Sequence, residues 1–235
     1  MKRIFMAVLF LFLSLCQTSE ASLVTFISDF PATNRIIDFN QFYGFNSFGP
    51  DPIQVGQLVG EDITWAANSH GGLLFGDPMS FYRFASNGDW KNGMTFAGVN
   101  AQPDGEIYSM RFTFNDGPVN FVGGFINYTP SVTPGDVIRF PEARLTVFDA
   151  FNNILETYDI KSQAPISTPN AINGGEYRGI RRPSDDIYSF ELSNSVIAID
   201  DLTFARNLNV VPEPATVLLF ASGLVGAYLR RKIGY

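Results

Sequence analysis

The stretch Glu106-Ile107-Tyr108-Ser109-Met110-Arg111-Phe112-Thr113-Phe114-Asn115 decides the fold, because large apolar side chains alternate along it with smaller or polar ones. The alternation places Met110, Phe112 and Phe114 on one side of an extended chain, which predicts a β-strand with one face in the core. The next residues, Asn115-Asp116-Gly117-Pro118, favour a turn. A second strand is predicted over Val119–Tyr128, so the centre of the chain indicates a pair of strands.

Similar short patterns recur on both sides of this pair. Further strands are predicted at Leu23–Ile27, Arg35–Asn40, Ile63–Ala67, Leu73–Phe75, Ser80–Ala85, Met94–Val99, Ala143–Asp149, Ile154–Ile160, Ile187–Ser193 and Val196–Phe204. Asp149–Asn153 is predicted to be a hairpin loop, and Lys161–Arg182, rich in Pro, Asn and Gly, a long loop over the sandwich. About a dozen short strands without long helical periodicity indicate an all-β protein, a single β-sandwich of jelly-roll type.

Length and charge limit what this sandwich can be. The chain has 235 residues and a formal net charge of −7, and five of its basic residues lie close to the two ends. The part between them is therefore more acidic than the whole chain, which argues against nucleic acid as a partner. Residues 22–205 are long enough for one domain with a substantial core.

The first 21 residues have the pattern of a signal peptide. Lys2 and Arg3 precede the apolar run Ile4–Leu15, and small residues lead up to a cleavage site for signal peptidase between Ala21 and Ser22. Cys16, the only cysteine, would leave with this segment. The mature chain would then have no disulfide and would depend on its core, or on metal ions, for stability.

The last 25 residues have three parts in order. Val211-Pro212-Glu213-Pro214 is followed by the uncharged run Val217–Leu229 and by the basic cluster Arg230-Arg231-Lys232. As a helix, this run would span about 20 Å, less than the roughly 30 Å hydrocarbon core of a bilayer. The basic cluster is predicted to stop translocation and to stay in the cytoplasm. A processed membrane segment therefore fits better than a permanent anchor.

This ending resembles the PEP-CTERM sorting signal of Gram-negative bacteria, also called the ice-binding-protein C-terminal domain. The resemblance implies an exosortase-type membrane transpeptidase as a partner, which would recognise Pro212, Glu213 and Pro214 and release the preceding domain. It also implies that residues 206–210 form a linker and that residues 211–235 form the sorting signal, with its hydrophobic helix. The protein would enter the inner membrane transiently and then reach the cell surface or the extracellular matrix.

The body also resembles, more diffusely, the lectin-like or carbohydrate-binding jelly rolls of PEP-CTERM proteins. The main motif of this resemblance is Ile199-Asp200-Asp201-Leu202-Thr203-Phe204, within the last predicted strand. It implies the fold of the body and assigns no activity to it.

Catalytic residue types are scarce, and we expect the protein not to be an enzyme. His70 is the only histidine, and it lies in a polar segment without a nucleophile motif. Because Cys16 would be removed with the signal peptide, one histidine remains, which cannot supply the usual set of zinc ligands. No cofactor is expected apart from a structural calcium ion, for which Asp200 or Asp201 is a candidate ligand. The alternative is that these carboxylates are simply solvated.

Trp90 is the candidate for sugar stacking. The segment Asn87-Gly88-Asp89-Trp90-Lys91-Asn92-Gly93 is predicted to be an exposed loop, and an exposed indole can stack on the apolar face of a sugar ring. The expected function is a non-enzymatic structural or adhesion role associated with exopolysaccharide or biofilm. A carbohydrate-binding module for exopolysaccharide and a glycan-active hydrolase or lyase are the alternatives.

Overall fold

The computed structural model describes residues 21–29, 34–43, 51–68, 72–74, 84–90, 95–99, 109–130, 143–168 and 172–206. Residues 1–20 of the predicted signal peptide, the sorting segment and His70 lie outside these ranges. Among the residues that the structure describes, no helix has the length and apolar character needed to cross a membrane.

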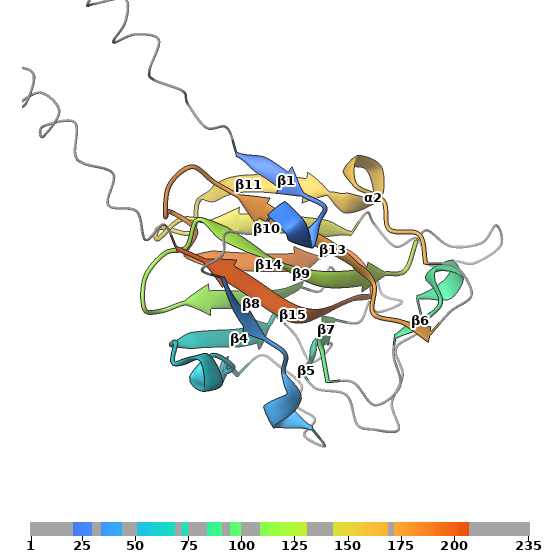
Figure 1. The fold of residues 1–235 in the computed structure, drawn as a ribbon, viewed down its shortest axis with the longest axis horizontal. Coiled ribbons are helices and arrows are strands. Elements are labelled where there is room, and N and C mark those ends of the chain that lie inside the picture. The colour runs from blue at the N-terminus through green and yellow to red at the C-terminus, as the bar shows by residue number, and fades with distance from the viewer. Residues whose placement is uncertain are drawn as a thin grey trace, which may run out of the picture.

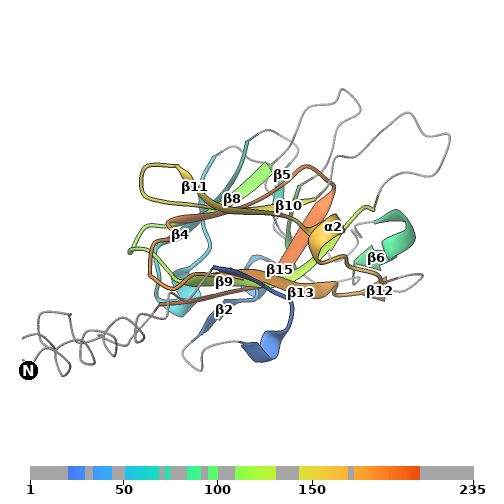
Figure 2. The same cartoon turned by 90° about the horizontal axis from the view of Figure 1, so that it is seen from above.

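Two antiparallel sheets pack face to face as a sandwich, which confirms the predicted fold class (Figures 1 and 2). The first sheet has the order β1 (Ser22–Val24), β13 (Glu176–Arg181), β9 (Phe121–Tyr128), β15 (Ile197–Ala205), β7 (Ala97–Val99) and β5 (Gly72–Leu74), and β2 (Arg35–Ile37) also pairs with β15. The second sheet has the order β11 (Ile154–Asp159), β10 (Arg144–Phe148), β14 (Ser189–Ser193), β8 (Ser109–Phe114), β4 (Ile63–Ala67) and β3 (Ile53–Gln54).

Short elements complete the described fold. A two-stranded parallel pair joins β12 (Ile172–Asn173) to β6 (Asp89–Trp90). The helical turns are η1 (Ile27–Asp29), η2 (Asn40–Phe42), η3 (Gln57–Val59), η4 (Ala85–Asn87) and α2 (Ile160–Gln163). All of them are single turns, so strands carry the architecture.

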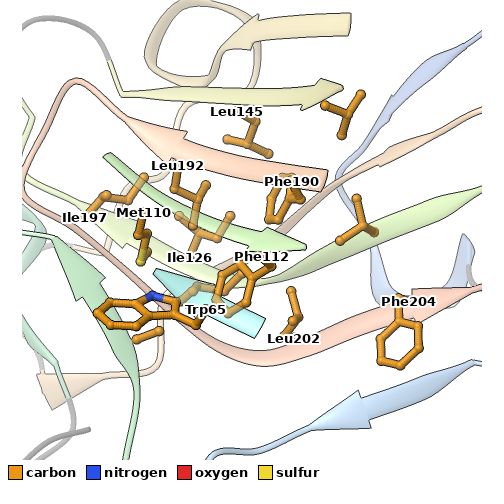
Figure 3. Close-up of a cluster of buried hydrophobic side chains, with 14 of the residues drawn as sticks. Trp65, Met110, Phe112, Ile126, Leu145, Phe190, Leu192, Ile197, Leu202 and Phe204 are labelled. Carbon is orange, nitrogen blue, oxygen red and sulfur yellow. The ribbon is translucent and has the colours of Figure 1, made fainter. Parts of the chain in front are cut away.

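The core lies between the two sheets and is rich in aromatic rings (Figure 3). In β8, Met110, Phe112 and Phe114 are buried, whereas the residues between them are half-buried, so the predicted alternation is confirmed. The Phe112 ring lies between those of Phe39 and Phe190, with centroids 6.1 and 6.5 Å away. Such pairs of rings add attraction to the burial of their apolar surface.

Two smaller apolar clusters cover the outer face of the first sheet. One contains Val24, Phe121, Tyr177 and Ala205, and the other contains Phe84, Trp90, Phe96 and Ala198. Since Ile197 and Ile199 face the main core, Ala198 between them points to the outer side of β15. Much of the first sheet is therefore covered on both faces.

The prediction of a long loop over Lys161–Arg182 is wrong for its last part. Residues Glu176–Arg181 form β13, which pairs with both β1 and β9. Arg178 in this strand is 5% exposed and donates hydrogen bonds to the carbonyl oxygens of Ala164 and Pro165, at 2.7 and 2.6 Å. A buried arginine that is satisfied by backbone carbonyls makes an inner strand look like a polar loop in the sequence.

Candidate functional site

The first described strand, β1, begins at the same end of the sandwich at which the last described strand, β15, ends. Register across the first sheet aligns Ser22 of β1 with Arg181 of β13, then with Phe121 of β9, and finally with Ala205 of β15. With neighbouring strands about 4.8 Å apart, Ser22 lies roughly 15 Å from Ala205. Figure 1 shows the start of β1 and the end of β15 on the same side of the molecule.

The second sheet contributes two hairpin connections to this end. One row across it runs through Ile154, Phe148, Ser189, Thr113, Thr64 and Gln54, and residues 149–153 and 55–62 lie beyond the row. Residues 115–120 and 182–188 connect the two sheets there. We call this part of the molecule the terminal end: the start of β1, Arg206, and residues 55–62, 115–120, 149–153 and 182–188.

Glu61 holds the point where the chain leaves the sandwich. Its carboxylate forms ion pairs with Arg35 and, at 2.7 Å, with Arg206. The side chain of Glu61 is only 6% exposed, so it meets these guanidinium groups largely away from water. Arg206 also donates hydrogen bonds to the carbonyl oxygens of Gly117 and Pro118, each at 3.2 Å. The residue after β15 is thereby fixed to two connections of the terminal end.

The connection between β13 and β14 is held in a similar way. Arg182 donates two hydrogen bonds to Asp186, at 2.7 and 2.8 Å, and a third to Glu156 of β11 at 2.6 Å. The hydrogen bond to Asp186 is the main cause that raises the pKa of Arg182 above its ordinary value. This connection is therefore tied to the edge strand of the second sheet.

The β10–β11 hairpin presents an exposed ring at the terminal end. The Asp149 carboxylate accepts hydrogen bonds from the backbone N–H groups of Phe151 and Asn153, both at 2.8 Å, and from the Asn153 amide at 2.9 Å. Asn152 has φ 62°, a conformation that asparagine tolerates well. The Phe151 side chain is 85% exposed on this ordered turn, so its exposure does not come from a loose loop.

The Asp149→Ala substitution is expected to loosen this hairpin. Hydrogen bonds from Asn153 and then from the backbone hold the pKa of Asp149 below its ordinary value of 3.8. The stabilisation is therefore present above that value and is lost as the pH falls through the lowered folded-state pKa. Hydrogen exchange of the amides of Phe151 and Asn153 at pH 7 should be faster in the variant.

The same experiment has an internal control. Amides of β8, at the centre of the second sheet, should exchange at the same rate in both proteins. Wild-type exchange at residues 151 and 153 that is as fast as in the variant would contradict the role given to the Asp149 carboxylate.

The opposite end of the sandwich is joined by buried amide side chains. Asn87 donates hydrogen bonds to the carbonyl oxygens of Tyr128 and Ile166, both at 3.1 Å. Asn127 donates to the carbonyl oxygen of Asn87 and to the Thr168 hydroxyl, both at 3.2 Å. These bonds tie η4, the end of β9 and the chain after α2 together.

The prediction that Trp90 is exposed is wrong. Trp90 lies in β6, is 1% exposed, and packs against Phe84 and Phe96 with ring centroids 6.0 and 5.9 Å away. The ring fills the outer cluster on the first sheet and presents no face to a sugar. The polar neighbours of Trp90 in the sequence suggested a loop, whereas the pairing of β6 with β12 folds the ring inward.

Asp200 and Asp201 lie at an irregularity in β15, where the pairing with β9 shifts between Asp200 and Thr203. Asp201 has φ 48°, and its N–H donates to the Asp200 carboxylate at 2.8 Å. Within the described ranges, no group of three His, Cys, Asp or Glu residues is placed to hold a metal ion. Calcium binding at Asp200 or Asp201 stays a prediction.

The remaining candidate residues lie outside the described residues. These are Val211, Pro212, Glu213 and Pro214 of the sorting motif, and Arg230, Arg231 and Lys232 of the basic cluster. Ala21 and Ser22, on either side of the predicted signal cleavage, are described, and Ser22 is the first residue of β1. Glu61, Arg35 and Arg206 were not predicted, because 26 and 145 positions separate the partners and no local pattern joins them.

The protein is an antiparallel β-sandwich, and β15, its last described strand, is followed by the C-terminal segment. Residues 210–232 of that segment match the family described as the PEP-CTERM protein-sorting motif. The chain therefore carries this motif at its C-terminus, as the sequence predicted, and is an exported protein that an exosortase processes and that is sorted to the cell surface. No curated protein matches the chain.

Proposed function

We propose that the protein is a non-enzymatic structural or adhesion component of the cell surface or the extracellular matrix, associated with exopolysaccharide. One observation carries this proposal. Ser22 and Ala205 lie in one row at the terminal end, so both predicted membrane segments join the sandwich there. The opposite end would then face away from the membrane before processing, and away from the attachment point after it.

The buried polar groups of the described residues support a structural role. Glu61, Arg178, Asn87 and Asn127 are all engaged in bonds that join separate elements of the fold. Such bonds stabilise the sandwich because a buried polar group without a partner is costly. This use of polar side chains fits a stable displayed domain.

The alternative of exopolysaccharide recognition through Trp90 loses its binding residue, because that ring is buried. The further alternative, a glycan-active hydrolase or lyase, needs carboxylates roughly 5 to 10 Å apart across a cleft. Two acidic side chains of the terminal end, Glu61 and Asp186, are instead paired with arginine.

The proposal is tested by intact-mass spectrometry and fractionation of the native protein in its host, beside a variant with Pro212→Ala and Pro214→Ala. We expect the native chain to lose both terminal segments and to leave the inner membrane. The variant should keep its C-terminal segment and stay in the membrane fraction. A native chain that keeps residues 218–235 and remains in the inner membrane would contradict a surface role.

A further inference from the structure

We propose that the terminal end rests on the zwitterionic phospholipid surface while the precursor is held in the membrane, with Phe151 and Leu58 as its apolar contacts. This inference rests on the proposed function, because it needs a precursor with membrane-held termini. The precursor would then contact the membrane through a surface of its folded domain as well as through its sorting segment.

The exposed apolar side chains of the terminal end are the first observation. Phe151 is 85% exposed in the β10–β11 hairpin, and Leu58 is 71% exposed in η3, within the connection between β3 and β4. Ile154, next to the hairpin, is 63% exposed. The edge strands β11 and β3 of the second sheet lie about 24 Å apart, five strand spacings, and Phe151 and Leu58 lie in the connections next to these opposite edges.

These side chains belong to ordered parts of the fold. Asp149 holds the turn that carries Phe151, as described above. Leu58 lies between Gly56 and Gly60, where the Val59 N–H donates to the Gly56 carbonyl and the Gly60 N–H to the Gln57 carbonyl, both at 3.1 Å. The Val59 carbonyl also accepts a hydrogen bond from Arg35. Both contacts are thus fixed relative to the exit at Arg206.

The length of the chain outside the sandwich is the second observation. Seven positions separate Leu15, the end of the predicted signal core, from Ser22, and eleven separate Arg206 from Val217. Fully extended, these connections reach at most about 25 Å and about 40 Å. Two short connections to one end of a rigid body bring that end to the membrane surface, and a weak contact then suffices because its effective concentration is high.

The charges of the terminal end determine which lipid surface fits. Asp62, Asp116 and Asp149 are exposed or half-exposed there, and hydrogen bonds from Asn115 and Gln54 hold the pKa of Asp62 below its ordinary value. The negative charge of these aspartates would be repelled by a strongly anionic surface. A zwitterionic headgroup layer, such as phosphatidylethanolamine, avoids this repulsion and accepts the exposed apolar side chains.

The test measures how close each residue lies to lipid in the full chain. The only native cysteine is removed by Cys16→Ser, and a bimane probe is attached at Phe151→Cys, at Leu58→Cys, or at the control Ile172→Cys. Ile172 is 66% exposed and lies in β12 at the opposite end, so it matches Phe151 in character but differs in position. The protein is reconstituted in phosphatidylethanolamine-rich vesicles that carry a lipid with a headgroup nitroxide.

We expect quenching of the probes at 151 and 58 to be at least several-fold greater than at 172, and to fall when the anionic lipid fraction is raised. Equal quenching at all three positions, with the protein still floating with the vesicles, would overturn this inference and leave the proposed function intact. Failure of the full chain to float with the vesicles would overturn both. Quenching at 151 alone would overturn the role assigned to Leu58.

Discussion

The Phe112→Ala variant is expected to lose about 3 to 5 kcal/mol of unfolding free energy, the range for removing a buried phenylalanine. Phe112 is fully buried in β8, and its ring lies between those of Phe39 and Phe190. These rings come from three separate parts of the chain, so the cavity would be lined by elements that cannot close without moving the sheets. Urea unfolding followed by tryptophan fluorescence measures the loss.

The matched control makes the same chemical change on the surface. Phe151→Ala removes a ring that is 85% exposed, and we expect the free energy of unfolding to change by less than about 0.5 kcal/mol. Equal losses in the two variants would show that Phe112 does not occupy the core position described above. The control also shows that variants at position 151 are folded, on which the lipid-contact experiment depends.

The second large effect is expected at the exit of the chain. Glu61→Ala removes a carboxylate whose side chain is 6% exposed and leaves Arg35 and Arg206 without their shared partner. Breaking a fully buried pair costs about 3 to 5 kcal/mol, but these arginine side chains are 49% and 25% exposed. Water screens and solvates them in part, so we expect a loss of about 2 kcal/mol in urea unfolding.

A surface ion pair provides the comparison for Glu61. Arg144 and Asp159 pair across β10 and β11, with side chains 43% and 35% exposed. Asp159→Ala should therefore cost less than about 1 kcal/mol. A loss at Glu61 no larger than the loss at Asp159 would mean that the exit of the chain is held mainly by the backbone pairing of β15.

The parts of the fold that were predictable are those in which one strand face is buried and the other is not. β8 is the clearest case, since Met110, Phe112 and Phe114 alternate with half-buried residues. The hairpin at Asp149–Asn153 was also predictable, because Asp and Asn bond to their own backbone and favour a tight turn. Both signals are local, so they can be seen without knowing what the segment packs against.

β13 and Trp90 were not predictable, because distant segments decide their environment. Arg178 is buried only because the chain after α2 supplies carbonyl oxygens. Trp90 is buried only because Phe84, Phe96 and Ala198 form a second cluster on the outer face of the sheet. The same limit applies to the terminal end, where register across four strands brings Ser22 and Ala205 into one row.

That row has a consequence for crowded surfaces. If the β-sandwich is attached to a surface through the residues after Ala205, its terminal end faces that surface. Every attached copy then has the same orientation. In a dense layer of the protein, the end of the sandwich that contains Asn87 and Asn127 would face away from the surface in every copy. Neighbours would meet side by side along sheet edges such as β11 and β5, so the spacing of the layer would follow from the width of the sandwich.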